Sequence, residues 1–350
     1  GFERYEVLGR TLYDQEGFHA LSTLRPEWKQ RAAEAERASH RTRSSAELAR
    51  RVDDALDRLA GERLFLFVHF FDPHYDYDPP EPYWRRFDPD YAGRFDPREF
   101  ASNPAGHAGM PARELEHVKA RYDGEIRFTD EHVGRILDAL AARGLARDTL
   151  VVVTSDHGEE FFEHGAIGHR RTLFDEQLRV PLVMRWPGVL PAGERMGMQV
   201  RSVDVLPTIL DLVGVPPPGE TSGTSLVPFL LDGHPERDLP AVSYLERPRY
   251  FTLTSLRHGD QKLVVRHKRR GDGGEIARLY RLDEDPREKR PLRVGDELAE
   301  AYDALEALRS QEASLRARLG LEDHAPRPLP DEMRRALEAL GYVDEEPAAP

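Results

Sequence analysis

The stretch that decides the fold is Thr154-Ser155-Asp156-His157-Gly158-Glu159-Glu160, which directly follows the apolar run Leu150-Val151-Val152-Val153. A β-branched run of this kind is typical of a buried strand. In an α/β protein, the carboxyl end of a strand is where ligands and metals are held. Because the chain leaves its pleat at Asp156 and His157, both side chains can reach one cation. A polar turn after a core strand is the alternative that this stretch alone leaves open.

Two further segments contain histidines that could contact a bound ligand. Downstream, His164-Gly165 and Gly168-His169 place glycine beside histidine, which suits tight backbone turns around a ligand. Upstream, the run Leu64–Phe70 predicts another buried strand, and it leads into Asp72-Pro73-His74. An imidazole at such a strand tip can donate a hydrogen bond to an anionic oxygen or hold a metal. A loop histidine packed between tyrosines is the alternative for His74.

Periodicity predicts the remaining elements. Apolar residues at three- and four-residue spacing predict helices over 45–60 and 112–143, each followed by a strand, and a short strand over 180–186. From about residue 239 strands predominate, with a hairpin turn at Gly259-Asp260. The predicted strands are Ala241–Leu245, Tyr250–Arg257, Lys262–Arg266 and Arg278–Leu282. Two predicted helices, Glu297–Leu319 and Asp331–Leu340, close the chain. The sequence therefore predicts an α/β domain over 1–235 and a small antiparallel α+β subdomain over 236–350.

The composition narrows the classes of function. The 350 residues hold 63 acids against 50 Lys and Arg, a net charge of -13, which disfavours nucleic acid as a partner. No run approaches the roughly 18 to 20 apolar residues of a membrane span. Cysteine is absent, which excludes disulfides, thiolate metal ligands and a cysteine nucleophile from these residues. The first residues show no signal-peptide pattern.

Taken together, the motifs resemble those of one known family. They are Phe70–Tyr75, Thr154–Glu160, Gly165, Gly168-His169, Leu173–Leu182, Ser202–Leu210, Gly223–Leu226, Leu279–Glu288 and Leu340–Val343. In this order, and over almost the whole chain, they are similar to the sulfatase family of the alkaline-phosphatase superfamily. The resemblance implies an α/β fold with an alkaline-phosphatase-like mixed sheet flanked by helices. It also implies hydrolysis of sulfate esters with a divalent metal and a formylglycine nucleophile.

The resemblance also implies roles for individual residues. Asp156 and His157 would ligate the divalent cation, which is usually calcium in this family. Many members have Asn where His157 stands, and because an imidazole is a softer ligand than an amide oxygen, another divalent ion stays open. His74 matches a histidine that contacts the sulfate. His169 falls near a lysine that binds a sulfate oxygen, with Arg170 as a competitor one residue away; His169 could instead protonate the leaving oxygen.

Three family segments have no counterpart in the 350 residues. They are the Cys/Ser-x-Pro-x-Arg nucleophile segment, the paired aspartates of the metal site and a Gly-Lys-x-His-Leu segment. All three precede the family's Gly-Phe-Asp, and this chain opens with Gly1-Phe2-Glu3, so we expect an N-terminally truncated sulfatase of the bacterial type. We expect the chain alone to be inactive and to bind metal weakly, because Asp156 and His157 are two ligands where a hard cation takes six or more.

Two alternatives to the sulfatase interpretation remain open at this level. One is a phosphonate or phosphodiester hydrolase of the same superfamily, because the shared motif does not distinguish sulfur from phosphorus. The other is a non-catalytic module that binds sulfated glycans or another anion. Bacterial relatives are often periplasmic or secreted, but the sequence itself assigns no compartment.

Overall fold

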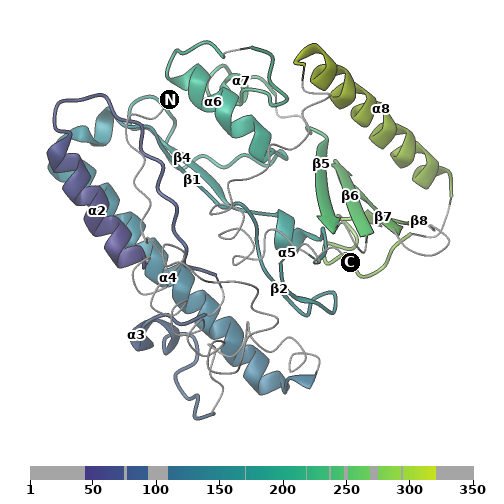
Figure 1. Cartoon of the computed structure of the whole chain (residues 1–350), viewed down its shortest axis with the longest axis horizontal. Coiled ribbons are helices and arrows are strands. Elements are labelled where there is room, and N and C mark those ends of the chain that lie inside the picture. The colour runs from purple at the N-terminus through teal and green to yellow at the C-terminus, as the bar shows by residue number, and fades with distance from the viewer. Residues whose placement is uncertain are drawn as a thin grey trace, which may run out of the picture. The chain divides into compact units, whose positions relative to one another are not determined.

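The computed structural model describes residues 44–74, 77–93, 109–169, 171–217, 219–235, 238–247, 251–268, 275–292 and 295–320. These residues form two compact units, 44–145 and 146–320 (Figure 1). The expected domain boundary at residue 235 falls inside the second unit, so that division stays a prediction. The helix expected over Asp331–Leu340 lies outside the described residues.

The first unit is built around helix α2 (Ser45–Arg58), close to the helix that the sequence predicts. Ser44 is its N-cap, and the Ser44 side chain accepts a hydrogen bond from the backbone N–H of Glu47. Val52 and Leu56, one turn apart, are buried, as expected for the apolar face of an amphipathic helix. The apolar spacing thus sets which face of α2 packs inward.

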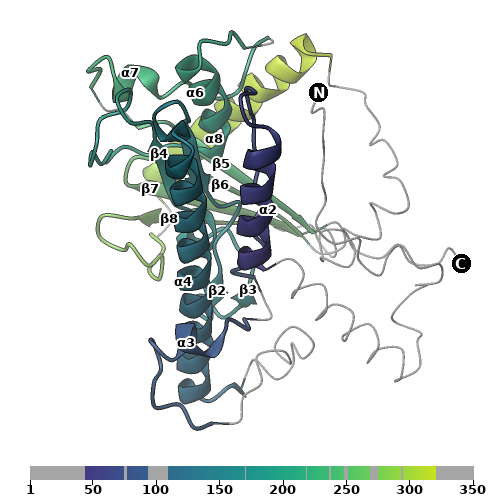
Figure 2. The ribbon, with the colours of Figure 1, turned by 90° about the vertical axis from the view of Figure 1, so that its left-hand side faces the viewer.

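A second helix, α4 (Ala112–Ala142), lies beside α2 (Figure 2). Arg143, which follows α4, forms ion pairs with Asp53 at 2.8 Å and Asp57 at 2.6 Å on α2. The short helix α3 (Glu81–Trp84) packs on α4 as well. These three helices form the frame that holds the loop leading to His74.

The prediction of a buried strand over Leu64–Phe70 is wrong. Among the described residues this segment pairs with no strand, and Phe65 and Phe67 are 63% and 79% exposed. An apolar run becomes a buried strand only when a neighbouring strand supplies the backbone partners and another layer covers its side chains. Within the described residues no strand pairs with this segment, so it runs on as irregular chain to the Asp72-Pro73 turn.

The second unit contains short elements around the Asp156 loop, followed by a separate sheet. The short elements are β1 (Val151–Thr154), β2 (Glu160–Phe161), β3 (Ile167–Gly168), α5 (Asp175–Leu178), β4 (Leu182–Arg185), a 3-10 turn (Ser202–Asp204), α6 (Val205–Leu212) and α7 (Val227–Leu230). A further 3-10 turn at Leu145–Arg147 leads into β1. Strand β1 pairs antiparallel with β4, and β2 with β3. The named strands of the described residues all pair antiparallel, so the expected mixed sheet is not assembled among them.

The C-terminal sheet confirms the predicted strands. Its strands are β5 (Ala241–Arg247), β6 (Phe251–His258), β7 (Gln261–Lys268) and β8 (Glu275–Arg281), adjacent in sequence order and all antiparallel. His258 pairs with Gln261 across the two-residue turn Gly259-Asp260. Gly259 has φ +59°, the left-handed conformation that a turn of this type requires of its first residue.

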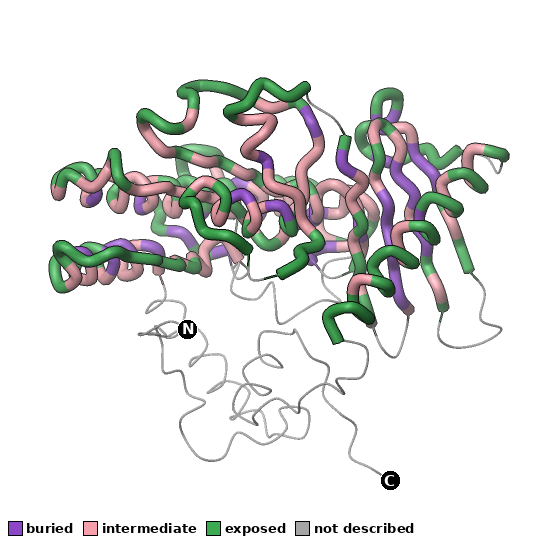
Figure 3. The backbone as a smooth tube through the Cα atoms, turned by 90° about the horizontal axis from the view of Figure 1, so that it is seen from above, coloured by how far each residue is buried: buried purple, intermediate pink, exposed green. Residues whose placement is uncertain are grey.

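Helix α8 (Asp296–Arg318) packs on one face of this sheet. The register places Leu256 opposite Leu263, and Leu263 opposite Leu279, so these three side chains form a row across β6, β7 and β8. Leu305 of α8 is fully buried against this row. Figure 3 shows the buried stretches along the middle strands of the sheet. This row is the hydrophobic core of the sheet.

Replacing Leu305 by Ala tests the importance of this core. The substitution leaves a cavity between α8 and the sheet, so we expect the free energy of unfolding to fall by about 2 to 5 kcal/mol. Urea denaturation followed by far-UV circular dichroism measures the change. The control is Leu319→Ala at a position 43% exposed, which should change stability by less than about 0.5 kcal/mol. Equal effects of the two variants would show that α8 does not cover the core.

Candidate active site

Asp156 and His157 lie immediately after β1, in the loop where the sequence predicts a ligand site. The strand ends at Thr154, whose hydroxyl donates a 2.9 Å hydrogen bond to the Pro181 carbonyl beside β4. Ser155 Oγ then donates to the His157 carbonyl at 2.8 Å, which closes a tight turn. Because of this turn, the side chains of Asp156 and His157 need not point to opposite faces, as consecutive residues of a strand do.

The hydrogen bonds of His157 determine its tautomer. Its Nδ1 lies 2.8 Å from the Gly158 carbonyl oxygen, which can only accept, so Nδ1 carries the proton. In the neutral imidazole the other ring nitrogen, Nε2, then presents its lone pair, and it lies 3.8 Å from Oδ2 of Asp156. The Asp156 side chain is 61% exposed. An imidazole nitrogen and a carboxylate oxygen at this separation fit two ligands of one divalent cation.

His169 is the third predicted site residue that the structure brings to this loop. Its ring stacks on the His157 ring, with centroids 4.0 Å apart and planes inclined by 27°. Its Nδ1 lies 3.1 Å from Oε1 of Glu159, and both residues are buried. The carboxylate fixes the ring orientation, as outer carboxylates do for histidines at metal sites. Glu159 had no predicted role, although its place two residues after His157 was a usable signal.

The two other predicted site residues, His74 and Arg170, stay predictions. Arg170 lies outside the described residues. His74 belongs to the first unit, where its half-buried ring lies 4.8 Å from the Phe71 ring. Asp72, two residues earlier, accepts hydrogen bonds from the Ser45 backbone at 2.9 Å and the Ser45 hydroxyl at 2.7 Å. The N-terminus of α2 thus fastens one side of the His74 loop.

Helix α4 fastens the other side of the same loop. Arg121 donates to the Tyr77 carbonyl at 2.9 Å and to the Asp78 carboxylate at 2.6 Å. Glu125, one turn further along α4, accepts from the Asp78 backbone N–H at 2.9 Å. Glu125 is buried, and its Oε2 has no hydrogen-bond partner among the described residues. Burial raises the pKa of Glu125 well above its ordinary value, and the charge of Asp72 raises it further.

A second carboxylate–histidine cluster lies in the second unit, but its potential ligand atoms already form hydrogen bonds within the protein. Glu160, His164 and Glu176 place one potential ligand atom each within 4.8 Å of the others. His164 Nδ1 bonds Glu176 Oε1 at 2.5 Å, and its Nε2 bonds the Glu288 carbonyl at 3.1 Å. Glu160 is fully buried and accepts four hydrogen bonds from the loop around it. The cluster is therefore structural.

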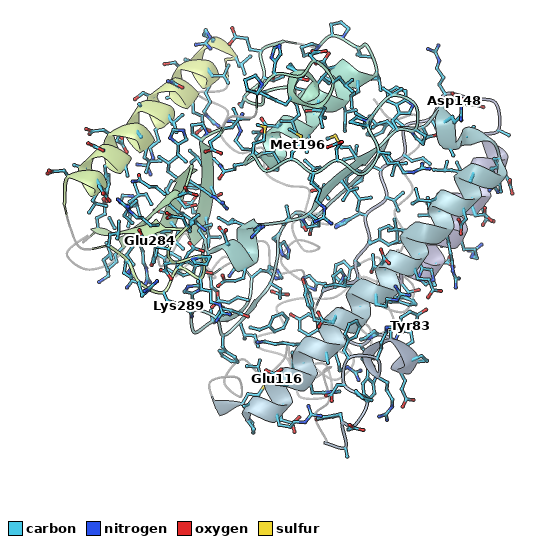
Figure 4. The ribbon with its side chains drawn as sticks, turned by 180° about the vertical axis from the view of Figure 1, so that it is seen from behind. Tyr83, Glu116, Asp148, Met196, Glu284 and Lys289 are labelled. Atoms are coloured by element: carbon cyan, nitrogen blue, oxygen red, sulfur yellow. The ribbon has the colours of Figure 1, made fainter. Side chains whose placement is uncertain are left out.

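The aromatic residues after His74 are, by composition, candidates for platforms that bind the substrate. The described ones instead pack α3 and its loop on α4. Trp84 is buried with its ring 5.1 Å from His117, and the Tyr91 ring stacks on His117 at 3.4 Å. Tyr83, labelled in Figure 4, donates to Glu131 at 2.8 Å. A role for these three in substrate binding has no support in the first unit.

Comparison with known proteins agrees with the resemblance seen in the sequence. Residues 9–215 match the profile of the family described as "Sulfatase", and residues 162–313 match "N-sulphoglucosamine sulphohydrolase, C-terminal". The phosphonate monoester hydrolase of Agrobacterium radiobacter superposes with a TM-score of 0.60 and 26% identity, covering 77% of this chain and 62% of that one. The fold is thus that of alkaline-phosphatase-like hydrolases. The chain belongs to the sulfatase family.

Individual relatives add detail. Arylsulfatase K of Danio rerio is 33% identical over 196 residues, which is 54% of this chain and 36% of the relative. A multifunctional alkaline phosphatase superfamily protein, PehA of Trinickia caryophylli, is 38% identical over 132 residues, 37% of this chain and 25% of that protein. The chain thus spans about a third or less of the length of these relatives. Within the described part of the chain, none of the helices has the length and apolar character that a bilayer crossing needs.

The buried carboxyl group of Glu125 predicts a pH dependence of stability. Above about pH 4.5 the unfolded state ionises this residue while the folded state keeps it protonated, so stability falls as pH rises, until the raised pKa is passed. The largest slope is about 1.4 kcal/mol per pH unit. Glu125→Gln, which cannot ionise, should lose this part of the slope. Urea unfolding of the parent chain and of Glu125→Gln at a series of pH values measures the difference. Parallel plots of the free energy of unfolding against pH would contradict this prediction.

Proposed function

We propose that this chain carries the sulfate-binding residues and two metal ligands of a sulfuric ester hydrolase. The observation that carries the proposal is the group at the end of β1: the Asp156 carboxylate 3.8 Å from His157 Nε2, with the His169 ring 4.0 Å from that of His157. The sulfatase family match and the likeness to arylsulfatase K support a sulfate ester as the substrate.

Each residue has a distinct task in this proposal. Asp156 and His157 would hold a divalent cation, calcium or a softer ion, which would supply positive charge to the reaction. His74 and His169, or Arg170 in place of His169, donate hydrogen bonds to those oxygens as negative charge develops on them. In an alternative role, His169 delivers a proton to the leaving oxygen. Glu159 holds the His169 ring in place for this transfer.

The 350 residues alone should hydrolyse no sulfate ester. None of them is cysteine, and no Ser-x-Pro-x-Arg occurs among them, so the family's formylglycine has no precursor here. Without a nucleophile no attack on sulfur takes place, so the hydrogen-bond donors and the cation have no transition state to stabilise. Turnover of an aryl sulfate by the purified 350-residue polypeptide would overturn this part of the proposal.

A second candidate is a phosphonate or phosphodiester hydrolase. The observation that favours it is the superposition on a phosphonate monoester hydrolase over 77% of this chain. Sulfuryl and phosphoryl groups both develop charge on equatorial oxygens, so the same donors serve either. Comparing an aryl sulfate with a phenyl phosphonate ester as substrates of the natural gene product separates the two candidates.

Substituting Asp156 tests the proposed metal pair. Its side chain is largely exposed and its carboxylate accepts a hydrogen bond from the neighbouring His157 N–H, so Asp156→Asn should change stability by less than about 0.5 kcal/mol. In the natural gene product we expect kcat/KM for the preferred ester to fall by at least about a hundredfold. The control is Glu297→Gln, which removes an ion pair with Arg281 on the C-terminal sheet. Comparable activity of the Asp156 variant and this control would count against the metal pair.

Substituting His157 tests the identity of the ion. His157→Asn supplies the amide oxygen found in many sulfatases, a harder ligand than the imidazole. We expect at least a roughly tenfold shift in relative affinity from Mn²⁺ towards Ca²⁺, measured by isothermal titration of each ion into the same protein. An unchanged ratio of the two dissociation constants would show that His157 is not a ligand.

A further inference from the structure

Helix α5 connects the candidate metal loop to the C-terminal sheet. It has only four residues, and three of them bond different parts of the second unit. Asp175 faces the C-terminal sheet, Glu176 bonds His164, and Gln177 bonds both Glu160 and the metal loop. Glu284 and Lys289, labelled in Figure 4, mark the turn after β8, and this turn contains Glu288.

The contact with the sheet is a buried group of charges. Lys262 on β7 is 1% exposed, and its Nζ lies 2.7 Å from Oδ1 of Asp175 and 2.9 Å from Oε1 of Glu288. Glu288 Oε2 accepts the Asp175 backbone N–H at 2.7 Å. Arg257 on β6 pairs with the other Asp175 oxygen at 3.0 Å. Two cations thus face two carboxylates, and the position of α5 is determined by the positions of β6, β7 and the Glu288 turn.

The contact with the metal loop is one of backbone against backbone. Gly158, next to His157, donates its N–H to the Gln177 carbonyl at 2.8 Å. A Cβ atom placed on Gly158 would lie 2.1 Å from the Glu176 carbonyl oxygen. Only glycine fits this approach, and its own carbonyl is the acceptor that sets the His157 tautomer. A displacement of α5 therefore moves the atom that orients the proposed metal ligand.

We propose that Lys262 and Glu288 are positioning residues for the Asp156–His157 pair, acting through α5 and Gly158. The inference rests on the proposed function only in taking that pair as metal ligands. A purely structural ion cluster would stabilise the sheet and leave His157 unaffected. A positioning cluster fixes the His157 ring as well, because Asp175 and Gln177 belong to one helical turn and cannot move independently.

The variants for the test break the connection at either end. Lys262→Met/Glu288→Gln removes one positive and one negative charge together, so no single buried charge is left unbalanced. Gly158→Ala acts at the other end and changes none of the charged side chains of the ion cluster. The matched control is Leu305→Ala, which weakens the same sheet through its opposite face and touches none of these residues. Unfolding curves confirm that each variant is folded under the conditions of measurement.

The primary measurement is the imidazole nitrogen spectrum of His157 in the 350-residue chain, with ¹⁵N-labelled histidine and no metal added. We expect the Nδ1-protonated pattern to shift or lose its single form in both test variants and to stay unchanged in Leu305→Ala. The second measurement is Mn²⁺ affinity, which should fall about tenfold in the test variants. Unchanged His157 signals in both test variants would overturn the inference.

The two proposals fail in different ways. If Asp156→Asn binds Mn²⁺ as the parent chain does, the metal pair is wrong, while the His157 spectrum still decides whether the cluster positions that ring. If the test variants lose stability as Leu305→Ala does and the His157 spectrum is the same in all three, Lys262 and Glu288 are structural only.

Discussion

The carboxylate of Glu160 is the interaction on which the candidate site depends. It is fully buried, and it accepts the backbone N–H groups of His164 and Ala166, the Thr172 hydroxyl and the Gln177 side-chain amide at 2.9 to 3.1 Å. One acceptor with four donors thus holds a histidine loop, two short strands and α5 in a single arrangement.

Local patterns in the sequence predicted the regular elements well. The periodicity of Val52 and Leu56 predicts α2, and alternation with a Gly-Asp turn predicts the β6–β7 hairpin. The patterns fail where long-range partners decide the outcome. The run Leu64–Phe70 has the composition of a strand but no strand beside it among the described residues, and composition alone does not supply a partner.

The same distinction holds for the candidate site. Asp156 and His157 could be picked out because they follow an apolar run directly, and the structure places them in one turn with His169. The charges around Asp175 could not be assigned from spacing. Lys262 and Glu288 are 87 and 113 residues from Asp175, and a lysine in the middle of a predicted strand gives no sign that it is buried. The buried acid Glu125 was missed for the same reason.

The exposed run around Phe65 and Phe67 has a consequence for handling the protein. Seven residues of high β-propensity with both phenylalanines accessible make a template for self-association between molecules. The chain brackets this run with Glu62-Arg63 before it and Asp72-Pro73 after it. Charges and proline in such flanking positions act as gatekeepers that interrupt the growth of an intermolecular sheet. Concentration and ionic strength should therefore govern how long the protein stays monodisperse, because salt screens the charges that keep neighbouring copies apart.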